Sequence, residues 1–137
     1  MAPGKTRRPP RAASRKSAAG TQAPALNIRV DLGADFALGP GKVRLMELIA
    51  KQGSISAAGR AMGMSYRRAW LLVDSLNKAF REPLVASQTG GRKGGGAVLT
   101  KLGQSVVENY RSIEAETTAT AKAALRALAD ALSARRP

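Results

Sequence analysis

One stretch of the chain, residues 53–80, constrains the fold more than any other, because its pattern predicts two short helices joined by a tight turn. Ser54 and Ser65 can each cap a helix, since a serine hydroxyl accepts a hydrogen bond from a free backbone N–H at a helix start. Gly63 lies between them, where a residue in the left-handed conformation would let the chain turn. The stretch is therefore predicted to be a helical hairpin.

The apolar residues of this hairpin recur at helical spacing, so each helix gains one face that can be buried. In the first helix the small residues Ala57, Ala58 and Gly59 leave room for another helix to approach closely. The second helix is expected to bury an inner face with two flanking residues. The inner face comprises Ala69, Val73, Leu76 and Phe80, and the flanks are Trp70 and Leu72.

The start of the second helix carries the candidate functional residues, namely Ser65, Tyr66, Arg67 and Arg68. In a helix-turn-helix this end of the second helix enters the DNA major groove. Arginines can bind guanine edges or phosphates there, and a tyrosine can contact either. The alternative interpretation is an ordinary helical hairpin with a solvated basic end.

Two further elements are predicted before this hairpin. Residues 26–36 begin with alternating apolar and polar residues, which is the period of a half-buried strand. A turn containing Pro40 follows and can start a helix, expected over residues 42–51 and ended by Gly53. Three short helices in tandem, the last two joined by a tight turn, predict a trihelical DNA-binding core.

A glycine-rich hairpin is predicted directly after the third helix, which Pro83 ends. Short strands are expected over residues 84–88 and 97–100, and the loop between them carries Arg92 and Lys93 among glycines. This arrangement is typical of a wing, a hairpin that brings cations to the sugar-phosphate backbone or the minor groove. The alternative is a loop without function, since the glycines match neither a P-loop nor a dinucleotide-binding fingerprint.

The last predicted element is one long helix over residues 101–133, capped by Thr100, because apolar residues continue at helical spacing and no glycine follows Gly103. Its second half has little left in its own chain to pack on, so we expect it to hold a homodimer together. The alternative is a solvated, alanine-rich helix that frays at its end. The expected fold is thus mainly α with a small β-hairpin, a winged helix-turn-helix over residues 26–100 followed by a dimerisation helix.

The charge of the chain indicates a polyanionic partner. The 137 residues contain 23 Lys and Arg against 9 Asp and Glu, which gives a net charge of +14. Nucleic acid would relieve the resulting self-repulsion, and an anionic membrane surface is the second candidate. Residues 1–25 add a basic, proline-containing tail, predicted to be disordered and either solvated or in contact with phosphates.

The sequence contains no histidine and no cysteine, so it lacks the usual general base, the commonest metal ligand and any disulfide. We therefore expect neither an enzyme nor a bound cofactor. No apolar run approaches the ~18 residues of a membrane helix, and nothing resembles a secretory signal. The chain is expected to be cytoplasmic and associated with the nucleoid rather than with a membrane.

Two segments of the sequence resemble the N-terminal DNA-binding domain of ModE-type molybdate-responsive regulators, which share a winged-helix fold with LysR-type regulators. They are GSISAAGRAMGMSYRRAWLLVDSLN and PLVASQTGGRKGGGAVLTKLGQSVVENYRSIE. The resemblance implies a bacterial transcription regulator that binds double-stranded DNA as a dimer. It assigns the DNA contacts to the second helix of the motif and to the wing, here Ser65, Tyr66, Arg67, Arg68, Arg92 and Lys93.

The resemblance also bears on what the chain is not expected to bind. ModE proteins continue into a molybdate-binding region of small β-barrel modules, whereas no strand-rich segment follows the last predicted helix here. We therefore expect no molybdate binding from this chain alone. The alternative function is that of a nucleoid-associated protein that binds DNA with little sequence specificity, which the net charge and the basic tail favour.

Overall fold

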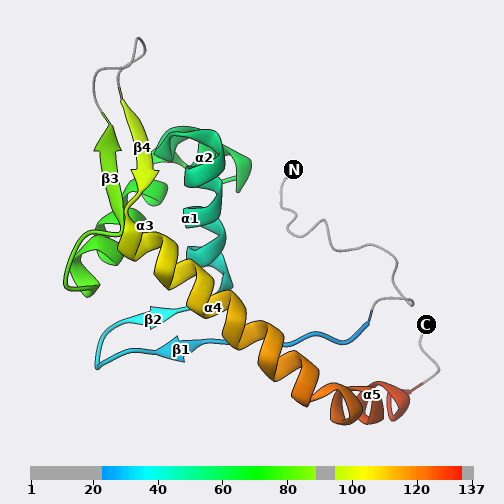
Figure 1. The fold of residues 1–137 in the computed structure, drawn as a ribbon. Helices are drawn as coiled ribbons and strands as arrows, with labels where there is room; N and C mark the ends of the chain where they lie inside the picture. Colours follow the sequence, from blue (N-terminus) through cyan, green and yellow to red (C-terminus); the bar gives the residue numbers. More distant parts are fainter. Residues whose placement is uncertain (1–22, 89–94, 134–137) are drawn as a thin grey trace, which may run out of the picture. The chain divides into compact units, whose positions relative to one another are not determined.

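The computed structural model describes residues 23–88 and 95–133 of the chain, which Figure 1 shows coloured along the sequence. The chain divides into two units, of which the first is Leu26–Ala119 and the second includes the described residues from Thr120 onward. In the first unit a pair of short strands precedes three helices in the sequence, and a second pair follows them before a longer helix. The predicted class, mainly α with a winged helix-turn-helix and a long helix after it, is confirmed.

Three short helices make up the centre of the first unit, α1 (Pro40–Gln52), α2 (Ile55–Ala61) and α3 (Tyr66–Ala79). Pro40 lies in the first turn of α1, where its missing N–H costs no hydrogen bond. Gly53 ends α1 in the left-handed conformation, with φ of 80°. Both ends of α1 therefore follow from the proline and the glycine that the sequence places there.

The tight turn between α2 and α3 forms as predicted. Gly63 adopts a φ of 73°, and its N–H donates to the Arg60 carbonyl over 3.0 Å. The Met64 N–H donates to the Gly59 carbonyl over 3.0 Å, which completes the pair of bonds of a Schellman motif. Gly59 is buried, and a Cβ at this position would lie 2.9 Å from the Cβ of Ala69 on α3. The predicted close approach of another helix to the small residues of α2 is thus confirmed at Gly59.

The core of the first unit draws on helices and strands alike. Its largest fully buried side chains are Val43, Leu45, Met46, Ile49, Leu76, Leu84 and Tyr110. The predicted inner face of α3 is confirmed, since Ala69 and Val73 are buried with Leu76, and Phe80 packs partly buried against them. The ring of Phe80 meets that of Phe36 edge to face, with centroids 5.6 Å apart.

The N-terminal strand is shorter than the alternation over residues 26–36 predicts. Only Val30–Asp31 (β1) pairs, in antiparallel orientation, with Ala37–Leu38 (β2). Gly33, with φ of 83°, lies in the loop that reverses the chain between them. The sequence pattern predicted the strand but not its partner, because a two-residue strand has no periodicity to detect.

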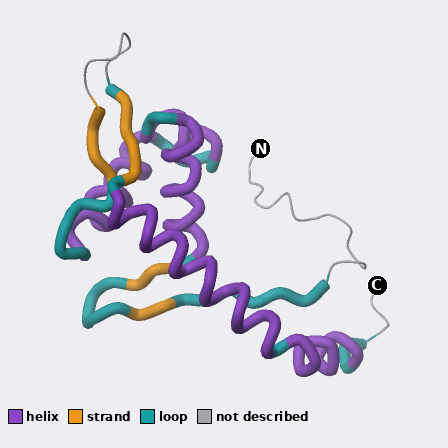
Figure 2. The backbone as a smooth tube through the Cα atoms, in the orientation of Figure 1, coloured by secondary structure: helices purple, strands orange, loops and turns teal. Residues whose placement is uncertain are grey.

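The hairpin predicted after α3 is present as β3 (Val85–Gln88) and β4 (Gly96–Leu99), paired in antiparallel register along their length. Figure 2 marks this hairpin and the β1–β2 pair as strands, and the two pairs form separate sheets. The Ala97 N–H donates to the Gly53 carbonyl over 2.9 Å. This bond ties the loop-side end of β4 to Gly53, the residue that ends α1.

The next helix, α4 (Lys101–Thr120), begins with the predicted cap. The Thr100 hydroxyl accepts from the Gly103 N–H over 3.0 Å and donates to the Pro83 carbonyl over 2.8 Å. Gly103 is buried, and a Cβ there would overlap the carbonyl oxygen of Leu84. Glycine therefore allows α4 to approach the start of β3 this closely.

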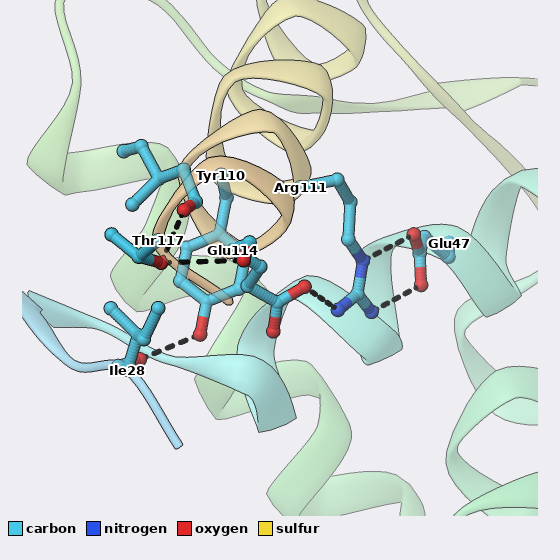
Figure 3. A network of polar contacts seen from close by, with 7 residues as sticks. Ile28, Glu47, Tyr110, Arg111, Glu114 and Thr117 are labelled. Atoms are coloured by element: carbon cyan, nitrogen blue, oxygen red, sulfur yellow. Dashed lines mark hydrogen bonds and ion pairs between the residues drawn. The ribbon is translucent and has the colours of Figure 1, made fainter. Parts of the chain in front are cut away.

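Two neighbouring residues of α4, Tyr110 and Arg111, bind elements that are distant in the sequence (Figure 3). The buried Tyr110 hydroxyl donates to the Ile28 carbonyl over 2.6 Å. The Arg111 guanidinium donates to both carboxylate oxygens of Glu47 on α1, over 2.8 and 2.9 Å, and to Glu114 over 2.6 Å. Its hydrogen bonds hold the pKa of Glu47 below the usual value, while burial raises the pKa of Tyr110. These contacts fasten the first part of α4 to α1 and to the N-terminal segment.

The single helix predicted over residues 101–133 is wrong in one respect, because α4 ends at Thr120 and a separate helix, α5 (Lys122–Asp130), begins after Ala121. Residues 117–120 are threonine-rich, and the Thr117 hydroxyl donates to the backbone carbonyl of Ile113 over 2.5 Å. Threonines restrict χ1 in a helix, and their hydroxyls compete for its backbone and bend it. The spacing of the apolar residues alone did not predict this end of α4, because it does not reflect the helix propensity of the threonines.

Candidate nucleic-acid interface

The predicted contact residues of the second helix lie together at the start of α3. Ser65 caps α3, since its Oγ accepts from the Arg68 N–H over 3.1 Å. Ser65, Tyr66, Arg67 and Arg68 are all exposed. No acidic residue lies in this first turn, so the free N–H groups of the helix and two guanidinium groups give this end a positive potential. The end can therefore receive an anionic group such as a phosphate.

Arg67 and Arg68 project from different sides of α3. Side chains four residues apart share a helix face, so Arg67 lies with the exposed Leu71. Arg68 lies with Leu72, and both line a groove of about 970 Å³ that is also lined by Met62 and residues of the β1–β2 hairpin. Arg67 is therefore at the centre of the exposed face, whereas Arg68 is at its edge.

Two large apolar side chains that the sequence did not identify as functional also belong to the exposed face of α3. Trp70 is 45% exposed and Leu71 is 48% exposed. Trp70 had been expected on the flank of the buried face. The signal for Leu71 is in the sequence, because it lies two residues from both Ala69 and Val73, and a half-turn offset places it opposite their buried side.

Asn77 connects α3 to the β3–β4 hairpin, a role that the sequence analysis did not find. Its Oδ1 accepts from the N–H groups of Leu84 over 2.8 Å and Val85 over 3.0 Å. Its Nδ2 donates to the Val85 carbonyl over 3.0 Å. Trp70 lies two turns before Asn77, so it is on the side of α3 that faces the hairpin. A polar residue next to an apolar helix face is the signal, but it does not reveal the partner.

The β3–β4 hairpin follows the helix-turn-helix in the chain, as the wing of a winged helix-turn-helix does. The Ala97 N–H donates to the Gly53 carbonyl at the end of α1, and the Leu84 and Val85 N–H groups donate to Asn77 on α3, so the hairpin is bonded to both helices. The predicted cations Arg92 and Lys93 fall outside the described residues, and so does the basic tail over residues 1–22. The wing contacts predicted for them therefore stay predictions.

The remaining charges on α3 leave it basic. Asp74, the one acid in this helix, pairs with Lys78 over 3.0 Å. On α2 the exposed Arg60 donates to the Ser56 hydroxyl over 2.9 Å. The described part of the helix-turn-helix therefore presents positive charge without an acidic partner at Arg67 and Arg68, next to the cap, and at Arg60 on α2, whose serine partner is neutral.

Neither a metal-ligand cluster nor a membrane-spanning helix occurs in the part of the chain that the structure describes. Within residues 23–88 and 95–133, no three His, Cys, Asp or Glu side chains gather closely enough to hold a metal ion. None of the helices in these two ranges combines the length and the apolar character that crossing a bilayer requires.

Comparison with known proteins identifies the same region. The family described as bacterial regulatory helix-turn-helix protein, lysR family, matches residues 41–104. The molybdenum transport protein ModE of Azotobacter vinelandii is 40% identical over 91 residues, which are 66% of this chain and 33% of that protein. The molybdenum-pterin-binding protein MopA of Rhodobacter capsulatus is 41% identical over 81 residues, 59% of this chain and 31% of MopA.

The name of a third relative states a function. The DNA-binding transcriptional dual regulator ModE of Escherichia coli K12 is 41% identical over 71 residues, 52% of this chain and 27% of that regulator. The similarity thus spans about a third or less of the length of these relatives. The residues that match the family, 41–104, run from α1 to the start of α4. Over these residues the chain carries the helix-turn-helix domain of the LysR family of bacterial regulators, in the form found in ModE-type proteins.

Proposed function

We propose that this chain is a DNA-binding transcriptional regulator that inserts α3 into the major groove of its operator. The observation that carries the proposal is the exposed, capped and acid-free start of α3, with Tyr66, Arg67 and Arg68 side by side. In helix-turn-helix proteins this end of the second helix contacts base edges. The relative named as a DNA-binding transcriptional regulator supports the same function.

Arg67 and Arg68 have different roles in this proposal. Arg67, at the centre of the exposed face, is placed to reach guanine O6 and N7, the commonest specific arginine contact in the major groove. Arg68 lies at the groove-lined edge, so it is better placed for a phosphate on the rim of the major groove. Ser65 caps the start of α3. The backbone N–H groups of this first turn would face the same phosphate group of the DNA.

The β3–β4 hairpin acts as the wing in this proposal. It follows α3 directly and is held beside it by Asn77. Arg92 and Lys93 would then contact the sugar-phosphate backbone or the minor groove, and they would add affinity without reading bases. The basic tail of residues 1–25 would add affinity in the same way.

A homodimer is part of the proposal. Leu128 and Leu132 are 67% and 75% exposed, and Ile113 on α4 is exposed as well. Exposed leucines at helical spacing lose favourable burial unless a second helix covers them. A second copy of the same helices would cover them in a two-fold arrangement, which also matches the two half-sites that dimeric helix-turn-helix regulators bind.

The molybdenum-pterin binding named for MopA is not carried over to this chain, because the similarity covers about a third of the length of MopA. We propose that this chain alone does not bind molybdate. Calorimetric titration with molybdate and with sulfate tests this. Equal weak heats for both anions are expected, whereas saturable binding of molybdate that is tighter than that of sulfate would contradict the proposal.

The second candidate is a nucleoid-associated protein that binds DNA by charge alone, which the net charge of +14 favours. Selection of binding sites from random duplexes, followed by competition at fixed salt, separates the two candidates. A sequence-specific regulator should prefer the selected duplex over a scrambled one by roughly a thousandfold or more. Equal competition by both duplexes would support the nucleoid-associated protein instead.

A further inference from the structure

The exposed face of α3 combines positive charge with an unusual amount of apolar surface. Trp70 and Leu71 are about half exposed in the middle of the helix, and Tyr66 at its start is 57% exposed. Trp70 lies four residues after Tyr66, and Leu71 lies four residues after Arg67, so the four side chains form two adjacent rows. A surface of this kind suits a ligand that is anionic overall and has apolar groups at defined positions.

The major groove of DNA has this character. Its edges carry phosphates, while each thymine presents a C5-methyl group on the groove floor. An apolar side chain that contacts this methyl distinguishes thymine from cytosine, which has no such group and presents an amino donor nearby. In the proposed complex, Arg67 and the start of α3 contact guanines or phosphates. Trp70 and Leu71 lie one turn further along α3 and would contact the next part of the major groove.

We propose that Trp70 and Leu71 read thymine methyl groups, so that the operator carries A·T pairs opposite the middle of α3. The inference rests on the proposed function, because it requires α3 to lie in the major groove. It assigns base selection at those positions to apolar contact, beside the hydrogen-bonding arginine. Leu71 shares the row of Arg67 and therefore reads the base pair next to the one that Arg67 contacts.

A change in the DNA tests this directly. Replacing single thymines of a selected duplex by deoxyuridine removes one methyl group and leaves base pairing and charge unchanged. For each methyl that the protein contacts, the dissociation constant should rise roughly threefold to fivefold, the size expected for burying one methyl-sized group. Thymines outside the contacted positions should tolerate the replacement.

Variants of the protein assign each effect to a side chain. Leu71→Ala and Leu71→Asn should abolish the sensitivity to deoxyuridine at one position, and Trp70→Ala should abolish it at another. Leu71→Asn keeps most of the side-chain volume, and both sites are on the surface, so the fold should survive, which thermal unfolding verifies. Leu32→Ala is the matched control, since Leu32 is an exposed leucine in the β1–β2 loop.

The outcomes separate this inference from the proposed function. If the protein binds its selected duplex specifically and no deoxyuridine replacement changes the affinity, the thymine inference is wrong, while the proposed function as a regulator still stands. Unchanged DNA affinity and unchanged sensitivity to deoxyuridine in the Trp70 and Leu71 variants would also overturn it. Loss of all sequence preference in the unaltered protein would instead contradict the proposed function itself.

Discussion

At the scale of single residues, the position of α3 against α2 depends on the contact between Gly59 and Ala69, which leaves no room for a larger side chain at residue 59. Gly59 of α2 lies so close to α3 that a Cβ would come within 2.9 Å of the Ala69 Cβ. This contact, with the Gly63 turn, determines how far the start of α3 extends from the body of the domain. The same glycine was recognisable in the sequence as part of the small run of α2, although its partner Ala69 was not.

Gly59→Ala should destabilise the domain by roughly 1–2 kcal/mol, because overpacking outweighs the better helix propensity of alanine. Adding Ala69→Gly should recover part of the loss, so that the double variant is more stable than the sum of the two changes predicts. Urea unfolding measures both. The control is Gly41→Ala, where nothing lies within 4 Å of the added Cβ and stability should hold or rise. Strict additivity of the pair would show that the two residues do not limit each other.

The ion pair between Glu47 and Arg111 should make stability depend on pH. Hydrogen bonds from Arg111 lower the pKa of Glu47, so the folded state favours the carboxylate. This contribution is present above the unfolded value of 4.5 and is lost as the pH falls through the lower folded pKa. Glu47→Gln should therefore cost about 1 kcal/mol at pH 7 and progressively less below about pH 4.5.

Urea midpoints of the wild type and of Glu47→Gln at several pH values measure this convergence. Glu116→Gln is the matched control, since Glu116 is exposed on α4 and its carboxylate accepts only from the nearby Ser112 hydroxyl among the bonds found in the described residues. A gap between wild type and Glu47→Gln that stays constant from pH 7 to pH 4 would refute an electrostatic origin.

At the scale of elements, the relation between α3 and the β3–β4 hairpin rests on Asn77. Its side chain satisfies the N–H groups of Leu84 and Val85, two buried residues at the start of the hairpin. A reading helix and a wing act together on DNA only if their spacing is constant. Asn77 therefore links the stability of the domain to the geometry of its proposed contact surface.

Asn77→Ala should cost about 2–3 kcal/mol, because it leaves two buried donors without the amide oxygen. At a temperature where the variant is still folded, it should also weaken DNA binding, since the hairpin loses its fixed position beside α3. Ser75→Ala, a change at an exposed site on the same helix, is the control and should do neither. Urea unfolding and DNA titration on the same samples give both numbers. Unaltered stability in Asn77→Ala would mean that the hairpin is held by other contacts.

How much the sequence predicted differs from element to element. Ser54, Gly63, Ser65 and Thr100 were identified correctly as caps and turns, because capping chemistry is local. The β1–β2 pair and the bonds of Asn77 were missed, since they join residues with no shared periodicity. The break at Ala121 was missed because apolar spacing continues across it, while the weakness lies in the threonines before it.

The candidate site followed the same division. The local structure at the start of α3 was predicted correctly, because the cap Ser65 and the residues Tyr66, Arg67 and Arg68 after it are contiguous in the chain, while their DNA contacts stay a prediction. The different surroundings of Arg67 and Arg68 could not be read from adjacency, since consecutive residues point to different sides of a helix. The exposure of Trp70 was not predicted either, because a tryptophan near a buried face is expected to be covered.

At the scale of the whole molecule, the exposed Leu128 on α5 and Leu132 just after it lead to a prediction about assembly. We expect the chain to be a homodimer, and Leu128→Glu should dissociate it, because a charge replaces an apolar side chain that a partner helix would bury. Ala123→Glu, an exposed site on the opposite side of α5, should leave the dimer intact. Light scattering at micromolar concentration measures the mass. A wild-type monomer under these conditions would contradict the dimer.

The central claim, that α3 reads bases while the wing and tail supply charge, has a direct consequence for variants. Arg67→Ala should cost about 1–3 kcal/mol on the selected operator and little on scrambled DNA, because a base contact exists only on the correct sequence. Arg68→Ala, at the edge of the face, should have the smaller effect on specificity. Arg92→Ala with Lys93→Ala should weaken both duplexes alike and lower the salt slope by about one for each lost phosphate contact.

The measurement that tests this most directly is a set of binding titrations at several salt concentrations. Wild type, Arg67→Ala and the Arg92→Ala, Lys93→Ala double variant are each titrated on the selected and the scrambled duplex. The account predicts that Arg67→Ala reduces the ratio of the two affinities, whereas the double variant preserves that ratio and flattens the salt dependence. Equal losses on both duplexes with the same salt slope for every variant would contradict it, because no part of the protein would then be reading sequence.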